Sequence, residues 1–373
     1  MKILFLTPWY PDEKLPNHGI FIQDQATALA ANNQVQVISS KVDYTGFGFF
    51  SKKIIVNRNG NLTEKKLTIK RSLPLFNQIN YFYCTISESL KTCKEFNPDV
   101  IHSNIGYPGA FWGWCVSLLT KKPWILSEHT LLNNNFRSPV HRWFTIHFLQ
   151  KANAVVTVSN YSAGIIKKNT GIKAIVIPNI IRFDLFKEKK LSTKPEVHIG
   201  FLGSGFFEKK GLMTLLTALS KINANYILHI GGNDPKRNFY EMHAKSLGIE
   251  NKCLWHGEIL RNQVPEFMDR LDFFVNCSLF ESFGMAIAEA MSCGLPVVCT
   301  SNGGPADFIN ETNGILVPAG DDASLSQALL KMINHYGDYD SKIIREQVKV
   351  KFSESPFCNS INAVYLNAIK HQV

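Results

Sequence analysis

Short apolar runs alternate with segments of helical spacing along almost the whole chain, and no other feature restricts the possible folds as strongly. Runs such as KILFLT, QVQVISS and DVIHS have the length and the bounding turns of buried strands. Apolar residues recur at helical spacing between them, for example in residues 20–31, 79–96 and 108–119. Strands that alternate with helices in this way predict a parallel, doubly wound sheet.

The pattern starts a second time after residues 187–195, a charged and polar segment that ends at a proline and is typical of a linker. The run VHIGFLG then begins a new series of strands and helices. A chain of 373 residues has room for two domains of ordinary size. The sequence therefore predicts an α/β protein with two Rossmann-like domains, residues 1–186 and 187–350, whose parallel sheets face an interdomain cleft.

The net charge of +10 is concentrated in the first half of the chain. Residues 1–186 hold 21 Lys and Arg against 10 Asp and Glu, whereas residues 187–373 hold 19 against 20. Residues 41–95 alone hold ten against four, close to the aromatic runs GFGFF and NYFY. A basic half predicts an anionic partner, either a membrane surface, a phosphorylated acceptor or nucleic acid. The alternative is a lysine-rich composition of the lineage. Because no recognition module for nucleic acid is found, we expect none as a partner.

Targeting signals and cysteines favour a cytoplasmic protein. The apolar run after Met1-Lys2 is too short for a signal peptide. Residues 100–120 lack charged side chains but contain a histidine, a proline and three glycines, which favours a buried strand and helix over a membrane span. The eight cysteines form no CxxC pair, and we expect them to be free thiols in a reducing compartment.

The stretch ESFGMAIAEA places Glu281 just before a glycine turn and Glu289 in the helix that follows. If the helix begins near Gly284, the amides of Phe283, Gly284 and Met285 point out of its N-terminus and form a site for phosphate. Phosphate repels carboxylates, so both glutamates should face neutral hydroxyl groups such as the diols of a sugar or ribose. This combination suits a nucleotide sugar. The alternative is that Glu281 caps the helix and Glu289 is a solvated helix residue.

Other loops after predicted strands add candidates. GFLGSGFFEKKG lacks the third glycine of a dinucleotide motif, but its Lys210 is a cation for a diphosphate or else a solvated lysine. Gly19 and the pair Gly303-Gly304 are positions where backbone can approach a ligand, or plain turns. His129, in SEHT, is a candidate base or hydrogen-bond donor, and His102 is expected in the core.

Metal ligands are not expected among these candidates. Asp338-Tyr339-Asp340 has the D-x-D spacing, but it follows INHYG and not a buried strand. No other cluster has ligand spacing, and there is no GxSxG, P-loop or Cys/His nucleophile signature. We therefore expect chemistry without a metal or a cofactor.

Taken in order, these loops resemble the retaining glycosyltransferases of family 4, which have the GT-B fold, and especially those that build bacterial surface polysaccharides. The similarity is strongest in residues 250–320, where DFFVNCSLFESFGMAIAEAMSCGLPVVCTSNGGPADFI resembles the E-x7-E region and the GG loop of the family. IPNIIRFDLF resembles its interdomain segment, EKKGLMTLLTAL its phosphate-binding loop, and LTPWYPDEKLPNHGIFIQDQATAL the start of its acceptor domain.

The resemblance implies roles for individual residues. Glu281 lies near the donor sugar and Glu289 binds the ribose, while Lys210 and the amides of residues 283–285 hold the diphosphate. Gly19 approaches the diphosphate from the first domain, His129 acts on the acceptor side, and the last helix, residues 351–373, crosses back to the first domain. Gly257, Glu258 and Ile259 lie by the base.

The sequence departs from the family at three positions. Ser204, in the donor-binding loop, replaces a frequent arginine. Asn104 replaces the second histidine of a D-x-x-H-x-H pattern, and Ile180 replaces the glycine of PNG. The first change leaves Lys210 with fewer cationic neighbours, and the second reduces the support for a catalytic role of the 102–104 loop.

The sequence thus predicts transfer of a sugar, with retention, from a nucleotide diphosphate sugar to a lipid-linked or polysaccharide acceptor. Glu281 and His129 are the predicted catalytic residues. The basic first domain predicts peripheral binding to the inner, anionic face of the cytoplasmic membrane. The alternatives are a nucleotide-sugar isomerase, epimerase or phosphorylase on the same fold, or a non-catalytic protein that binds sugar nucleotides.

Overall fold

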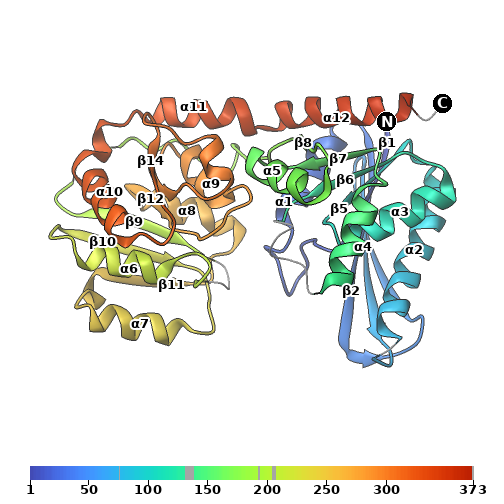
Figure 1. Ribbon diagram of the computed structural model, residues 1–373, viewed down its shortest axis with the longest axis horizontal. Helices are drawn as coiled ribbons and strands as arrows, with labels where there is room; N and C mark the ends of the chain where they lie inside the picture. The colour runs from blue at the N-terminus through green and yellow to red at the C-terminus, as the bar shows by residue number, and fades with distance from the viewer. Residues whose placement is uncertain (75, 131–137, 192–193, 204–206, 372–373) are drawn as a thin grey trace. The chain divides into compact units, whose positions relative to one another are not determined.

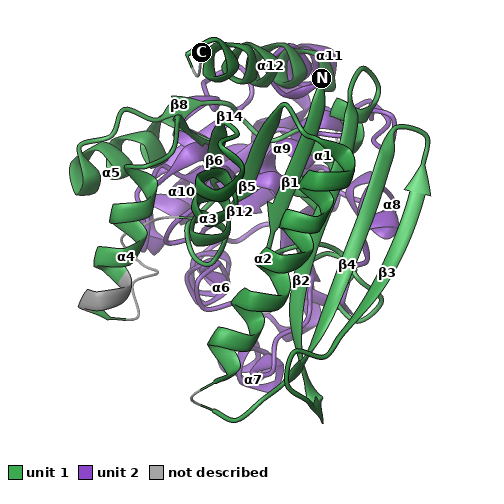
Figure 2. Cartoon of the chain, turned by 90° about the vertical axis from the view of Figure 1, so that its right-hand side faces the viewer, with its two compact units in different colours: residues 1–180, 354–373 green, residues 181–353 purple. Residues whose placement is uncertain are grey.

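A computed structural model describes residues 1–74, 76–130, 138–191, 194–203 and 207–371. The chain folds into two compact units, shown in separate colours in Figure 2. Unit 1 comprises residues 1–180 together with 354–373, and unit 2 comprises residues 181–353. The chain therefore passes from one unit to the other twice, after Ile180 and after Ser353.

Unit 1 contains an eight-stranded sheet with the strand order β3-β4-β2-β1-β5-β6-β7-β8 (labelled between Figure 1 and Figure 2). Neighbouring strands run parallel except β3 and β4, which are antiparallel. Strands β5 and β6 are buried along their whole length, because helices cover both faces of a parallel sheet. The strands are β1 (Lys2–Thr7), β2 (Gln34–Phe47), β3 (Lys52–Asn59), β4 (Leu62–Arg71), β5 (Val100–Asn104), β6 (Trp124–Glu128), β7 (Ala154–Thr157) and β8 (Ile175–Val176).

The two faces of this sheet build separate cores, because successive side chains of a strand point to opposite faces. Ile3 and Phe5 of β1 pack in one cluster with residues of α1 and α12. Leu4 and Leu6 pack in the other with residues of α2, α3 and α4. The helices are α1 (Ile20–Ala30), α2 (Asn77–Phe96), α3 (Gly109–Thr120), α4 (Pro139–Leu149), α5 (Asn160–Thr170) and α12 (Glu354–Lys370).

Helix α12 belongs to unit 1 although it follows unit 2 in the sequence. Its Tyr365 is fully buried, and the Tyr365 hydroxyl lies 2.5 Å from Nδ1 of His102 on β5. Nε2 of His102 lies 2.7 Å from the Ser127 hydroxyl on β6. His102 is therefore a core histidine, as predicted, and it ties the last helix to the sheet.

The uncharged segment 100–120 forms strand β5 and helix α3, as predicted. Among the described residues, no helix has both the length and the apolar character needed to cross a bilayer. All eight cysteines are free, and Cys277 and Cys299 are buried.

Unit 2 contains a six-stranded sheet with the order β11-β10-β9-β12-β13-β14, in which all pairs are parallel. The predicted pair of parallel α/β domains is therefore confirmed. The strands are β9 (Val197–Leu202), β10 (Tyr226–Gly231), β11 (Cys253–Gly257), β12 (Phe273–Asn276), β13 (Val297–Thr300) and β14 (Gly314–Val317). The helices are α6 (Leu212–Ser220), α7 (Arg237–Ser246), α8 (Val264–Asp269), α9 (Met285–Ser292), α10 (Asp322–His335) and α11 (Ser341–Phe352).

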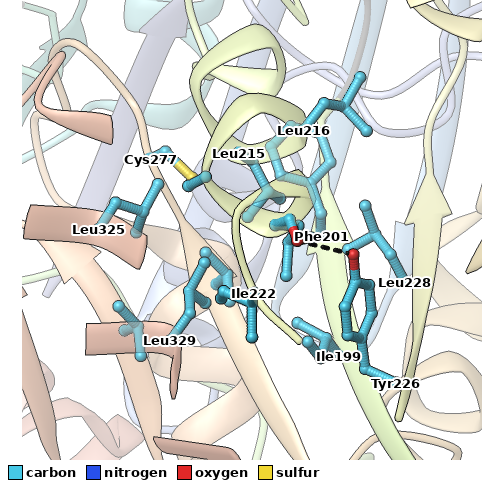
Figure 3. Packing of buried hydrophobic residues seen from close by; sticks show 14 of the residues in the cluster. Ile199, Phe201, Leu215, Leu216, Ile222, Tyr226, Leu228, Cys277, Leu325 and Leu329 are labelled. Atoms are coloured by element: carbon cyan, nitrogen blue, oxygen red, sulfur yellow. Dashed lines mark hydrogen bonds between the residues drawn. The ribbon is translucent and has the colours of Figure 1, made fainter. Parts of the chain in front are cut away.

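The main core of unit 2 lies between the sheet and helices α6 and α10, and Figure 3 shows part of it. Leu215 and Leu216 of α6 are fully buried in this cluster with Phe201 of β9. The Tyr226 hydroxyl donates a hydrogen bond to the carbonyl of Leu219 (2.9 Å), so the end of α6 is also held by a polar contact. This packing fixes α6, and with it the loop that precedes the helix.

Residues 187–195, predicted as a linker, lie in unit 2 where they are described. The Lys189 amide donates to the carbonyl of Cys293 (2.8 Å), and Lys194 forms an ion pair with Asp272 (2.9 Å). One backbone and one side-chain contact thus attach this segment to unit 2, while Lys187, Glu188 and Lys190 are exposed to solvent.

Strands β9, β10 and β11 each contribute one histidine to a hydrogen-bonded row. Nδ1 of His198 lies 2.8 Å from Nε2 of His229, whose Nδ1 lies 3.0 Å from Nε2 of His256. Burial, and next the neighbouring His256, lowers the pKa of His229 to about 4. While His229 is neutral, it therefore donates a hydrogen bond to one of the two neighbouring imidazoles and accepts one from the other.

We predict that His229→Gln reduces the pH dependence of the stability of unit 2. Unfolded histidine has a pKa of about 6.5, so between that pH and about 4 the unfolded state binds more protons than the folded state. The contribution of His229 is complete above about pH 6.5 and is lost as the pH falls. Urea unfolding should show that the wild type loses about 1–2 kcal/mol more than the variant between pH 7.5 and pH 5. His335→Gln, at a side chain that is 60% exposed, is the control; equal losses in wild type and His229→Gln would contradict the prediction.

Candidate functional site

Three of the loops that the sequence singled out in unit 2 follow neighbouring strands, β9, β12 and β13. Lys210 comes after β9, Glu281 after β12, and Gly303-Gly304 after β13. The carboxyl ends of parallel strands meet at one edge of a sheet, which is where ligands bind in folds of this kind.

Glu281 and Lys210 form an ion pair. The same carboxylate oxygen, Oε1, accepts hydrogen bonds from the Ser278 hydroxyl (3.0 Å) and the Asn276 side-chain amide (3.3 Å). The Glu281 side chain is 13% exposed and that of Lys210 is 30% exposed, so both reach solvent from a partly buried position. The structure thus joins two residues that the sequence pointed to separately.

Close backbone contact brings these two loops together. Gly211, at the start of α6, has φ +75°, and a Cβ there would lie 2.1 Å from the carbonyl oxygen of Cys277. The amide of Leu279 donates to the carbonyl of Lys209 (3.0 Å). Only glycine fits at position 211, and the close approach of Gly211 to Cys277 places Lys210 next to Glu281.

The Gly303-Gly304 loop supports the backbone of Glu281. The Gly304 amide donates to the Glu281 carbonyl (2.9 Å), and a Cβ on Gly303 would lie 2.0 Å from that carbonyl oxygen. A Cβ on Gly304 would lie 2.4 Å from the carbonyl oxygen of Ser282. Sequence reasoning left open a ligand contact or a plain turn. In the structure, both glycines are needed to let the loop pack against residues 281–282.

Helix α9 begins at Met285, after Gly284 in a left-handed conformation (φ +96°), as the sequence predicted. In the described part of the chain, the amides of Phe283, Gly284 and Met285 donate to no other group. The ring of Phe283 is buried against Phe308 and Phe352, at centroid distances of 5.8 and 5.0 Å. The turn is therefore anchored by a side chain, while its amides have no hydrogen-bond acceptor among the described residues.

Both alternative interpretations of the glutamates are wrong. No side chain caps α9, so Glu281 is not a helix cap. Glu289 is buried and not solvated, with a side chain that is 6% exposed.

Glu289 forms an ion pair with Arg261, whose guanidinium lies over the ring of Phe186 at 5.7 Å. Arg261 begins a short 3₁₀ helix in the connection after β11 and is 17% exposed. Sequence reasoning missed this residue. The available signal was a cation in the connection that follows a predicted strand, close to residues 257–259.

The residues predicted to lie by the base are at the end of β11. Gly257 is the last residue of the strand, with φ +71° and open space where a Cβ would be. Glu258 is exposed, and Ile259 lies against the end of β10, since a Cβ on Gly231 would be 3.0 Å from it. Their contact with a base stays a prediction, and Ser204 lies outside the described residues.

In unit 1, His129 follows β6 and is buried. Its Nε2 lies 3.0 Å from Oδ1 of Asn104, and its ring centroid is 4.7 Å from that of Phe21. Burial lowers the pKa of His129 to about 3, so the imidazole is neutral at physiological pH. Gly19 is the residue before α1, and a Cβ there would lie 2.5 Å from the carbonyl carbon of Trp9, so only glycine fits.

Glu128, next to His129, is a second buried group that sequence reasoning missed. Its Oε1 accepts from the amide (2.8 Å) and the hydroxyl (2.7 Å) of Thr130, and burial raises the pKa of the carboxyl group. A Cβ on Gly106 would lie 2.4 Å from Oε2, so glycine lets the backbone approach this carboxyl group. Glu128, His129 and Asn104 thus form a buried polar cluster at the ends of β5 and β6.

The D-x-D spacing of Asp338 and Asp340 has a structural explanation. Asp340 caps α11 by accepting from the amides of Lys342 (2.8 Å) and Ile343 (3.2 Å). Asp338 lies 3.0 Å from Nδ1 of His335. The two carboxylates therefore serve different local contacts.

The chain matches two adjoining protein families. Residues 19–185 match the family described as Glycosyltransferase Family 4, and residues 183–349 match the family described as Glycosyl transferases group 1. A Bacillus subtilis protein, named as the putative teichuronic acid biosynthesis glycosyltransferase TuaC, is 22% identical over 360 residues, which cover 89% of each chain.

Solved structures share the fold along the whole chain. The sucrose-phosphate synthase of Thermosynechococcus elongatus has a TM-score of 0.81 at 18% identity, and the match covers 100% of both chains. Anabaena HepE in complex with UDP has a TM-score of 0.78 at 19% identity, with 98% of this chain and 100% of that chain covered. Both family matches agree with the two parallel-sheet units and with the order of the loops. The chain belongs to the glycosyltransferases with the GT-B fold.

Proposed function

We propose that this glycosyltransferase moves a sugar, with retention, from a nucleotide diphosphate sugar to a lipid-linked or growing cell-surface polysaccharide. The observation that carries the proposal is the Lys210–Glu281 ion pair at the carboxyl edge of the sheet in unit 2. HepE has been solved with UDP-glucose, and TuaC is named for teichuronic acid biosynthesis. Both support a nucleotide sugar as donor and a glycan as acceptor.

On the donor side, Lys210 and the amides of residues 283–285 stabilise the departing diphosphate. Preorganised donors aimed at developing charge are the largest catalytic term in many enzymes. These groups supply the positive charge within the chain, so the proposed reaction proceeds without a metal. When the donor binds, its diphosphate replaces Glu281 as the partner of Lys210. The Glu281 carboxylate then faces the sugar and stabilises positive charge on the sugar ring. Glu289, held by Arg261, binds the ribose.

On the acceptor side, His129 orients the attacking hydroxyl group. A pKa of about 3 makes the imidazole a weak base at neutral pH, which favours hydrogen bonding to the hydroxyl over removal of its proton. We place the reaction at the inner face of the cytoplasmic membrane, where a lipid-linked acceptor is held.

The test is release of nucleotide diphosphate from a panel of UDP-, GDP- and ADP-sugars, with and without lipid-linked acceptors. We expect one donor to be consumed only with an acceptor and to give a product with the anomeric configuration of the donor. An altered nucleotide sugar formed without acceptor would indicate an isomerase or epimerase instead. A strict requirement for inorganic phosphate would indicate a phosphorylase. Donor binding without turnover on every acceptor would indicate a sugar-nucleotide sensor.

A further inference from the structure

Five aromatic side chains of unit 1 are exposed in the segments where β2 and β4 end and α2 begins. Figure 1 shows the backbone of α2 and of β2 in this part of unit 1. Each side chain is about half exposed, from 48% for Phe49 to 58% for Tyr83. Ring contacts join them into two groups, with centroids 5.6 and 6.4 Å apart along Phe47–Phe49–Phe76 and 4.8 Å apart for Phe50–Tyr83. We call this set, Phe47, Phe49, Phe50, Phe76 and Tyr83, the aromatic tip.

The aromatic tip is held in place by a buried side chain. Asn80 on α2 is 1% exposed; its Oδ1 accepts from the Phe50 amide (2.7 Å) and its Nδ2 donates to the Lys70 carbonyl (2.9 Å). The Gly48 amide also donates to the Arg71 carbonyl (2.9 Å). Phe50 has φ +51°, a conformation that bulky residues rarely adopt and that needs support from its surroundings. The exposure of these rings is therefore a fixed property of the fold.

Positive charge surrounds the aromatic tip. Lys53, Lys70 and Arg71 are exposed, and no ion pair of the described residues involves any of them. By contrast, Lys52 next to them is paired with Glu88 (2.9 Å). The neighbouring carboxylate of Asp43 accepts from the amide and the hydroxyl of Thr45. Among the described residues, Lys53 and Arg71 thus form no ion pair, and Lys70 is attracted by the nearby Asp43 carboxylate without forming one. The three cations lie beside the exposed rings.

Protruding rings flanked by cations match the layered chemistry of an anionic bilayer. Tyr favours the headgroup level, and Phe on interfacial segments is buried at the boundary between headgroups and acyl chains. Cations near the surface are attracted by anionic lipids. A second copy of the same surface is a poorer partner, because it would set Lys70 and Arg71 against like charges. The tip is also a protrusion, whereas a peptide ligand requires a groove or a sheet edge.

We propose that the aromatic tip docks unit 1 on an anionic lipid bilayer, with its rings in the headgroup region and Lys53, Lys70 and Arg71 against lipid phosphates. Only the biological role of this docking, access to a lipid-linked acceptor, rests on the proposed function. Binding to the bilayer itself needs neither donor nor acceptor.

Vesicle flotation tests the proposal with the full chain and no substrate. The probes are vesicles of phosphatidylcholine alone and of phosphatidylcholine with one-third phosphatidylglycerol, at low and physiological salt. We expect wild type to float with the anionic vesicles, and Lys70→Glu/Arg71→Glu to lower the partition coefficient by about tenfold or more. Phe49→Ser/Phe76→Ser should lower it by about tenfold as well, because both rings leave the headgroup region.

Matched controls come from α7 of unit 2. Phe239 and Met242 are 51% and 65% exposed, and Lys245 is an exposed cation, so Phe239→Ser/Met242→Ser and Lys245→Glu remove similar groups elsewhere. We expect both control variants to float like wild type. The tip variants should keep the far-ultraviolet circular dichroism and the melting temperature of wild type, since the altered side chains are exposed.

Three results would overturn the proposal. One is a wild type that does not float with anionic vesicles at low salt. Another is a pair of tip variants that float as well as wild type and the controls. The third is a dimer, measured by light scattering, that the tip variants abolish while flotation persists, which would assign the tip to self-association. None of these depends on turnover, so a failure of the proposed reaction would leave the flotation result readable.

Discussion

Replacing Glu281 by glutamine lowers nucleotide diphosphate release from the donor by about 10²–10³-fold, while unit 2 stays folded. Glutamine keeps the size of the side chain and can still accept from Ser278 and Asn276. It loses the negative charge that pairs with Lys210 in the free chain and that faces the sugar in the proposed reaction. Release is measured at saturating donor and acceptor, with the melting temperature as the check on folding.

Lys210→Met should cause a loss of similar size, because it removes the cation that stabilises the departing diphosphate. Since the two residues act as a unit, the double variant should be little worse than the poorer single variant. Glu208→Gln is the matched control, because Glu208 lies in the same connection as Lys210, between β9 and α6, and forms an exposed ion pair with Lys236. Full activity of either single variant would show that the Lys210–Glu281 pair takes no part in the reaction.

Replacing Arg261 by alanine destabilises unit 2 by about 3–5 kcal/mol. The change leaves the carboxylate of Glu289 buried, at 6% exposure, without its cation. For a unit of this size, each kcal/mol lowers the melting temperature by about 2–4 °C, so a loss of about 10 °C is expected. Differential scanning calorimetry measures it.

The double variant Arg261→Met/Glu289→Leu should recover most of this loss, because it removes the unpaired charge together with its partner. Arg270→Ala is the control, since Arg270 and Glu266 form an exposed pair at 52% and 72% exposure, worth less than about 0.5 kcal/mol. A melting temperature of Arg261→Ala equal to that of the control would show that the ion pair contributes little to the fold.

Local patterns were sufficient to predict the architecture. The runs around Leu4 and Val298 are short and apolar, as strands buried on both faces must be, and α1 and α9 follow the predicted turns. The antiparallel strand β3 was not predicted, because its exposed mixture of Lys53, Ile55 and Arg58 does not follow a core pattern. Edge strands are held by backbone pairing more than by buried side chains, so their sequence says little.

The site was predicted as single residues and not as pairs. Glu281 and Lys210 were both expected, but their contact depends on Gly211 fitting under the carbonyl of Cys277, which is a tertiary fact. The partner of Glu289 was missed for the same reason, since Arg261 reaches it from the connection after another strand. Spacing along the chain reports neighbours on one helix or strand, whereas these ion pairs join separate loops.

The return of α12 to unit 1 also determines the order in which the chain can be completed during synthesis. The ribosome makes residues 181–353 before it reaches α12, which at roughly 5–20 residues per second takes roughly 10–35 s. Unit 2 is continuous and has all its residues by then. Unit 1 cannot be completed before α12 is made, because His102 lacks its partner Tyr365 and the apolar face that packs against Phe357 and Ile361 is uncovered. The nascent first unit thus depends on a helix that is made after unit 2. A ribosome that stalls before residue 354 leaves unit 2 with all its residues and unit 1 without α12.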